Sequence, residues 1–217
     1  MKKKNKQQDK YDRKRRIYMN KIITMPLNKS IVKEIRAGDI CKITGTIYSA
    51  RDAAHRRMSE EIAKALGVSI DELLAEPDGF LSEEQKKLAR AALPFDITAQ
   101  TIYYLGPTPA RPGQVIGSAG PTTSTRMDKY TPLLLELGMS GMIGKGRRGD
   151  SVKASMKKNT AVYFAATGGA GALLSKCIKS SEIIAYEDLG TEAIRKLYVE
   201  DLPVIAVTDC YGTDAYS

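Results

Sequence analysis

The sequence predicts an α/β fold. Short apolar stretches rich in β-branched residues alternate along the chain with segments of helical period, and this alternation is typical of a sheet covered by helices. With 217 residues the chain is long enough for one well-buried core, and 42% apolar with 27% charged residues is an ordinary globular composition. No apolar run is long enough to span a bilayer, which argues against a membrane protein.

The first half of the chain contains one clear strand signal and three helix signals. Residues 40–50 (ICKITGTIYSA) read as a strand or a close pair of strands. They lead into residues 51–66, a helical pattern that Gly67 closes. Two capping boxes, SIDE and SEEQ, predict two further short helices between residues 70 and 93.

The second half continues the alternation. Residues 98–107 read as the next strand, and a helix is expected from Arg126 to a stop at Gly138. Pro132 either kinks that helix or marks its true first turn. Further along we expect a short buried strand at 139–144, a helix from about Asp150, a strand at 160–166, a Gly-rich turn at 168–174 and a final set of strands.

The net charge of +9 comes almost entirely from the start of the chain. Residues 1–22 hold ten Lys or Arg against two Asp, and the rest of the chain is nearly neutral. Such a segment is typical of a disordered tail, which leaves residues 23–217 as the folded domain. The tail is interpreted as a solubilising extension; the alternative is an arm that binds nucleic acid, in a binding or scaffold protein.

Residues of the types that commonly bind metals are few and scattered in this sequence. Cys41, Cys177 and Cys210 are far apart in the sequence and His55 is the single histidine, so the chain lacks a usual zinc motif and no metal ligand is assigned. His55 is interpreted as a packed or capping residue. Scattered cysteines and the lack of a signal peptide favour a cytoplasmic location.

Three junctions between a strand and a helix carry basic or hydroxyl side chains. They contain Arg51, then Thr122 with Arg126, and finally Lys145. Ligands of α/β proteins bind beyond the carboxyl ends of strands, and helix N-termini there receive anions. Two guanidinium forks and an ammonium group that converge at such an edge would suit a small molecule with more than one carboxylate. Singly, each residue has a simpler explanation: a threonine N-cap, a surface ion pair or a solvated lysine.

Several longer motifs resemble the class I fumarases. They are GTIYSARDAAHRR, YYLGP, GSAGPTTSTRMDKY, GKG and AATGGAGALLSKCIKSSEIIAYEDLGTEAI. The resemblance is to the C-terminal domain of these enzymes, which is a separate β subunit in two-subunit versions, and it covers roughly residues 22–217. Tartrate dehydratase β subunits share GPTTS-x-RM and GKG. Residues 59–92 look longer than the usual connection and are expected to be a helical insertion.

The resemblance implies a swivelling β/β/α domain that closes over a partner α subunit. The partner would hold an oxygen-sensitive 4Fe-4S cluster, and the two chains would form a higher-order α/β hetero-oligomer. Arg51, Arg126 and Lys145 would bind the carboxylates of fumarate or malate, and Thr122 would transfer a proton at the substrate carbon. The implied activity is that of a hydro-lyase of the tricarboxylic acid cycle, which interconverts fumarate and (S)-malate. Dehydration of L(+)-tartrate is the alternative within the same class.

Overall fold

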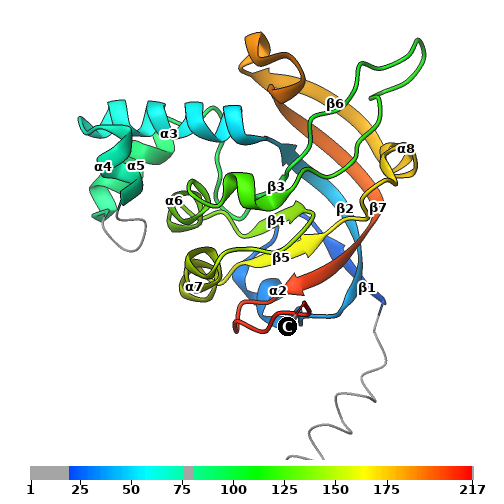
Figure 1. Ribbon diagram of the computed structural model, residues 1–217, viewed down its shortest axis with the longest axis horizontal. Helices are drawn as coiled ribbons and strands as arrows, with labels where there is room; N and C mark the ends of the chain where they lie inside the picture. The colour runs from blue at the N-terminus through cyan, green and yellow to red at the C-terminus, as the bar shows by residue number, and fades with distance from the viewer. Residues whose placement is uncertain (1–19, 76–80, 217) are drawn as a thin grey trace, which may run out of the picture.

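The computed structural model describes residues 20–75 and 81–216, which form an α/β fold around a seven-stranded sheet (Figure 1). The strands are β1 (Asn20–Thr24), β2 (Ile40–Ser49), β3 (Thr101–Tyr103), β4 (Gly141–Gly144), β5 (Val162–Ala165), β6 (Ile178–Ala185) and β7 (Ile194–Thr208). Their order in the sheet is β1-β2-β3-β4-β5-β7-β6, with a further pairing between β2 and β7. The predicted fold class is confirmed as a mixed α/β arrangement whose sheet is partly barrel-like.

The helices lie mainly on one side of this sheet. They are α2 (Lys29–Glu34), α3 (Asp52–Leu66), α4 (Ile70–Ala75), α5 (Glu83–Ala91), α6 (Thr131–Glu136), α7 (Asp150–Asn159) and the single turn α8 (Gly171–Leu174), with 3-10 turns η1 (Ser124–Met127), η2 (Ser175–Cys177) and η3 (Glu187–Glu192). Figure 1 shows α3, α4 and α5 grouped together beyond α6 and α7, while the long β6–β7 hairpin projects on the other side. Across the described residues, no helix combines the length and apolarity needed to cross a membrane.

Strand direction determines where the carboxyl ends meet. β2, β3, β4 and β5 are parallel neighbours, so their carboxyl ends lie at one edge of the sheet. β7 runs antiparallel to both β2 and β5 and thereby closes these strands into a ring. Connections between parallel strands need a crossover, and the chain supplies it with the helices that follow β2, β3 and β4.

Two apolar clusters pack against opposite faces of the sheet. Along β3 and the residue after it, Ile102 and Tyr104 contact the cluster beneath the helices, whereas Tyr103 contacts the cluster enclosed by β7 and α2. All three side chains are fully buried. This alternation follows from the two-residue period of a strand, and it explains why the central strands read as continuous apolar runs.

Most of the predicted elements are confirmed, with shifted ends. Residues 40–49 form a single strand, and α3 stops at Gly67, whose positive φ of 70° is the left-handed conformation of a helix C-cap. β1 and α2 were not predicted. β1 pairs with β2 through residues 20–24, so this strand begins within the last three residues of the segment expected as a tail; residues 1–19 of that segment lie outside the described ranges.

The two capping boxes are confirmed. In the second, Ser82 accepts a hydrogen bond from the backbone N–H of Gln85 and donates its own N–H to the Gln85 side chain. The resulting helix, α5, is held against α6 by an ion pair of 2.6 Å between Lys86 and Glu136. The segment expected as an insertion, 59–92, therefore forms the end of α3 and two packed helices, with residues 76–80 outside the described part.

His55 is buried in α3, as interpreted from the sequence. Its Nδ1 lies 2.8 Å from the carbonyl oxygen of Arg51, and its ring meets the Tyr104 ring edge-on with 5.4 Å between centroids. Burial lowers the pKa of the imidazole to about 4. The ring is therefore neutral in the folded protein at neutral pH.

We predict that His55 makes the fold sensitive to mild acid. The folded-state pKa lies below the ordinary value of 6.5, so the unfolded chain takes up the proton first and stability present above pH 6.5 is lost as the pH falls toward 4. The loss from this residue should reach about 2 kcal/mol at pH 5. Urea unfolding of the wild type and of His55→Asn, at pH 7 and pH 5, measures it. An equal loss in both proteins would contradict the prediction.

Candidate functional site

The sequence-predicted site residues lie at the carboxyl edge of the parallel strands. Arg51 follows the end of β2 and Lys145 follows the end of β4. Thr122 lies between Tyr104, which follows β3, and Lys145: its backbone N–H donates to the carbonyl of Tyr104 (2.7 Å) and its carbonyl accepts from the N–H of Lys145 (3.2 Å). The three junctions therefore lie along one edge of the sheet.

The helix expected from Arg126 is divided into two elements. Residues 124–127 form η1, and α6 begins at Thr131 with Pro132 in its first turn. Pro132 therefore marks the true first turn and does not kink a longer helix. Thr122 precedes both elements, because its backbone N–H donates to the carbonyl of Tyr104 and η1 begins two residues later.

Neither threonine of the PTTS segment acts as a cap. Thr123 is the N-cap residue of η1, yet its hydroxyl makes no capping hydrogen bond. Within the described residues the Thr122 hydroxyl has no hydrogen-bond partner either, and this side chain is half-buried. The simpler explanation for these threonines, helix capping, thus finds no support in the geometry.

Two acidic residues that the sequence analysis missed hold the arginines. Asp52 Oδ2 lies 2.7 Å from Arg126 Nη2, and its Oδ1 lies 3.8 Å from Arg51 Nε. Glu192 Oε1 lies 3.1 Å from Arg51 Nη2. Asp52 directly follows Arg51 in the sequence, which was an available signal, whereas Glu192 is brought in from far along the chain.

Glu192 also completes the start of α3. Arg51 is the N-cap residue of this helix and makes no side-chain capping bond, but Oε2 of Glu192 accepts from the backbone N–H of Ala53 at 3.0 Å. A carboxylate at a helix N-terminus satisfies an unpaired donor and interacts favourably with the helix dipole. One side chain of η3 therefore fixes both the helix start and the Arg51 guanidinium.

Glycine is required where Arg51 crosses the chain. A Cβ on Gly106 would lie 2.6 Å from Nη1 and 2.7 Å from Cδ of Arg51, which is closer than real contacts allow. The same Cβ would lie 3.3 Å from the carbonyl oxygen of Thr191. Gly106 of the YYLGP segment thus leaves room for the Arg51 side chain.

Lys145 is an exposed cation of the site, like Arg126. It forms no ion pair with any residue in the described ranges, and its backbone is fixed on both sides by Thr122 and Ser124. Its side chain reaches over Gly168, at the start of the Gly-rich turn. That turn packs closely on the residues just before the PTTS segment, because a Cβ on Gly171 would lie 2.9 Å from the backbone nitrogen of Gly120. The interpretation of 168–174 as a tightly packed turn is therefore confirmed.

A buried arginine, Arg148, holds the loop that carries Lys145 in place. The Arg148 side chain is fully buried and donates to the hydroxyls of Tyr104 (2.9 Å) and Thr131 (2.7 Å). Its Nε lies 2.9 Å from Oδ1 of Asp128, whose other oxygen accepts from the N–H of Gly149 (2.8 Å). This network ties the loop after β4 to the residues around η1 and was not foreseen from the sequence.

The cysteines of the described chain do not form a metal site. Cys41 and Cys210 are buried and Cys177 is half-buried, all three as free thiols. Burial raises the pKa of each, to about 12 for Cys41, so they stay protonated at neutral pH. No group of three or more His, Cys, Asp or Glu residues in the described ranges is arranged to hold a metal ion. These residues therefore do not fit an iron–sulfur cluster, which needs thiolate ligands.

Comparison with known proteins agrees with the resemblance carried by the motifs. Residues 1–72 and 81–217 match the family described as "Fumarase C-terminus". The unmatched residues, 73–80, fall inside the segment expected as an insertion.

The curated relatives are of two kinds. The chain is 35% identical over 176 residues to the aerobic class I fumarate hydratase of Escherichia coli K12, and 34% identical over 177 residues to fumarate hydratase 2 of Leishmania major. These matches cover 80% and 81% of this chain but only 28% and 27% of the relatives, so the chain spans less than a third of their length. A protein of Methanocaldococcus jannaschii, named provisionally as the β subunit of an L(+)-tartrate dehydratase, is 31% identical over 88% of both chains.

Glu192 provides a test of how the site is held. We predict that Glu192→Ala lowers the free energy of unfolding by about 1–2 kcal/mol, because a lost N-terminal cap alone costs about 1 kcal/mol. Glu192→Gln keeps an acceptor for the Ala53 N–H and should lose less than half as much. Chemical denaturation of the three proteins measures both values. Equal losses in the two variants would show that the charge on Glu192, and not its cap, matters.

Proposed function

The chain belongs to the fumarase C-terminus family, and from this premise we propose that it is the β subunit of a two-subunit iron–sulfur hydro-lyase that interconverts fumarate and (S)-malate. The observation that carries the proposal is the meeting of Arg51, Arg126 and Lys145 at one sheet edge. The relative from Methanocaldococcus jannaschii, named provisionally as the β subunit of an L(+)-tartrate dehydratase, supports the proposed role of a β subunit.

In this proposal the three cations bind a four-carbon dicarboxylate. Arg51 and Arg126 are linked through Asp52, so their guanidinium groups are held in place before substrate arrives. Each presents a planar fork that suits a carboxylate, whereas Lys145 adds a point charge. The same charges stabilise the negative charge that develops when a proton leaves the carbon next to a carboxylate.

Thr122 is proposed as the proton-transferring group. Its hydroxyl makes no hydrogen bond to a described residue. Thr122 lies between Tyr104 and Lys145 at the carboxyl edge of the sheet. A threonine hydroxyl is a weak base unaided, and it needs a carboxylate to accept its proton. Asp52 is engaged with Arg126, so we assign that carboxylate to the partner α subunit.

The partner is also proposed to hold the 4Fe-4S cluster, since the cysteines of this chain do not fit it. When bound there, the cluster would supply Lewis-acid chemistry at the substrate hydroxyl. We further propose that this domain is of the swivelling β/β/α type and closes over the α subunit, in a higher-order α/β hetero-oligomer. A cytoplasmic location belongs to the proposal, because an oxygen-sensitive cluster needs a reducing compartment.

Tartrate dehydration is a second candidate. It is favoured by the named tartrate dehydratase relative, which matches this chain over 88% of both lengths. Both substrates are four-carbon dicarboxylates, so the same three cations could bind either one. The other alternative, a nucleic-acid-binding protein, depends on the basic residues 1–22, and nothing in the described structure favours it.

Reconstitution tests the proposed function. The purified chain, mixed anaerobically with the iron-loaded α subunit of the same organism, should hydrate fumarate, and neither subunit alone should do so. Turnover of fumarate, mesaconate and tartrate by the same complex separates the two candidates. Robust activity of this chain alone, or no activity of the complex on any of the three, would contradict the proposal.

Thr122 and Thr123 form a matched pair for testing the proton transfer. We predict that Thr122→Ala lowers kcat by a factor of about 100 or more, the usual contribution of a positioned acid or base. The melting temperature should not change, because the Thr122 hydroxyl makes no hydrogen bond to a described residue. Thr123→Ala should keep near-normal turnover. Near-normal turnover in Thr122→Ala would remove the catalytic role of this residue.

A further inference from the structure

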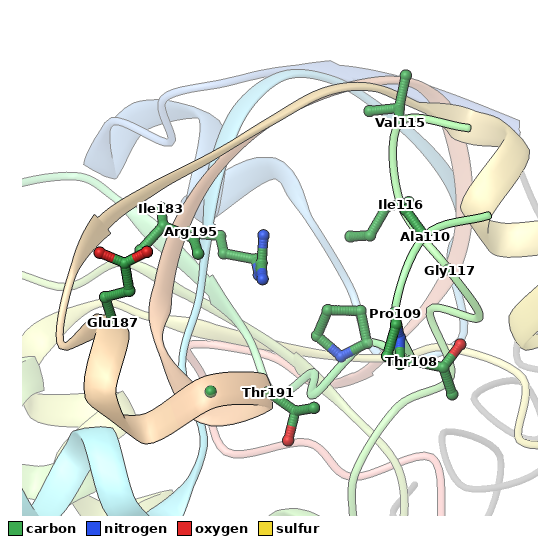
Figure 2. A pocket seen from close by; sticks show the side chains of 12 residues that line it. Thr108, Pro109, Ala110, Val115, Ile116, Gly117, Ile183, Glu187, Thr191 and Arg195 are labelled. Atoms are coloured by element: carbon green, nitrogen blue, oxygen red, sulfur yellow. The ribbon is translucent and has the colours of Figure 1, made fainter. Parts of the chain in front are cut away.

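A cavity of about 390 Å³ opens between the loop after β3 and the β6–β7 hairpin. Figure 2 shows the two walls facing each other, with the loop that carries Thr108, Pro109 and Ile116 on one side and the hairpin on the other. Most of the lining is apolar or backbone. Arg195, from β7, is the one basic residue in this lining.

The charge of Arg195 has no partner within the described structure. Its side chain extends from β7 into the space between the two walls (Figure 2), and it forms no ion pair or hydrogen bond with a described residue. Its Nε is buried without an acceptor, and burial lowers the pKa of the guanidinium. Glu187 lines the same cavity but forms no ion pair with it. A partly desolvated charge without a countercharge is unfavourable, so the cavity suits an anionic group from outside.

Exposed apolar side chains surround this charge. Val115 is 50% exposed and Ile183 is 37% exposed, and both line the cavity from opposite walls. A small free anion would leave these side chains in water. A polypeptide that carries a carboxylate between apolar residues would cover them and supply the countercharge, and arginine in such a setting is frequent among residues that dominate binding.

The cavity begins beside Arg51. Gly106 lies against the Arg51 side chain, and Pro107, the residue after Gly106, lines the cavity together with Thr191. Glu192, which holds Arg51, directly follows Thr191. Whatever fills the cavity therefore lies next to a proposed substrate-binding residue.

We propose that this cavity is a docking site for the α subunit, and that it receives an Asp or Glu side chain flanked by apolar residues. This inference rests on the proposed function, because the occupant is the subunit that completes the active site. Charge complementarity with Arg195 and the exposed apolar walls define the chemistry of the docked segment. Docking there would bring the α subunit up against Arg51.

Arg195→Glu tests the docking site, with Lys196→Glu as its matched control. Lys196 is the next residue of β7, is exposed, and points to the opposite face of the strand, so the control makes the same charge change outside the cavity. Arg195→Met and Val115→Asp are the second and third variants. The dissociation constant of the complex with the α subunit is measured anaerobically by titration calorimetry, and kcat is measured at saturating α subunit.

We expect Arg195→Glu to raise the dissociation constant by about tenfold or more, as for a central interface residue. Arg195→Met and Val115→Asp should raise it as well, while Lys196→Glu stays close to wild type. The kcat at saturating α subunit should not change in any of them. Wild-type affinity in the Arg195 variants, with full activity, would overturn the docking site and leave the proposed function standing. If the wild-type chain neither binds nor activates the α subunit, both the docking site and the proposed function are contradicted.

Discussion

Strand β7 pairs with β2 along one of its edges, and its other edge pairs first with β6 and then with β5. This double pairing closes β2, β3, β4 and β5 into a ring, and the rest of the architecture depends on it. The register sets Arg195 opposite Ser49, the last residue of β2. The start of β7 therefore arrives where α3 begins, and Glu192, three residues earlier, meets both Ala53 and Arg51.

The closed ring also explains how a nearly neutral domain offers a cationic edge. Because the strands are parallel, the loops that follow them lie at the same edge and place their cations there. Contacts with neighbouring side chains then hold these loops and cations in position. The two arginines are held by Asp52 and Glu192, and the Lys145 loop is held from below by the buried Arg148. Charges fixed before a ligand arrives need little reorganisation during a reaction, which is the main source of electrostatic catalysis.

Local signals in the sequence predicted much of the fold. α3 and its stop at Gly67, the capping boxes and the role of Pro132 depend on neighbouring residues only. Features that depend on distant contacts were missed: β1 is defined by its pairing with β2, and the backbone of Thr122 is bonded to Tyr104 and Lys145. The same holds within the site, because the bond from Ala53 to Glu192 joins residues 139 positions apart. The cations could be recognised by type and placement, and Asp52 by its position next to Arg51, whereas Glu192 could not be recognised.

The central claim is that one edge of the sheet holds a dicarboxylate between Arg51, Arg126 and Lys145. A crystal structure of the α–β complex, grown anaerobically with (S)-malate, tests it most directly. The account predicts that the two malate carboxylates lie within hydrogen-bond distance of these three side chains, with the Thr122 hydroxyl facing the carbon that exchanges its proton. Malate bound elsewhere, with Arg51 and Arg126 still paired to Asp52 and Glu192, would contradict it.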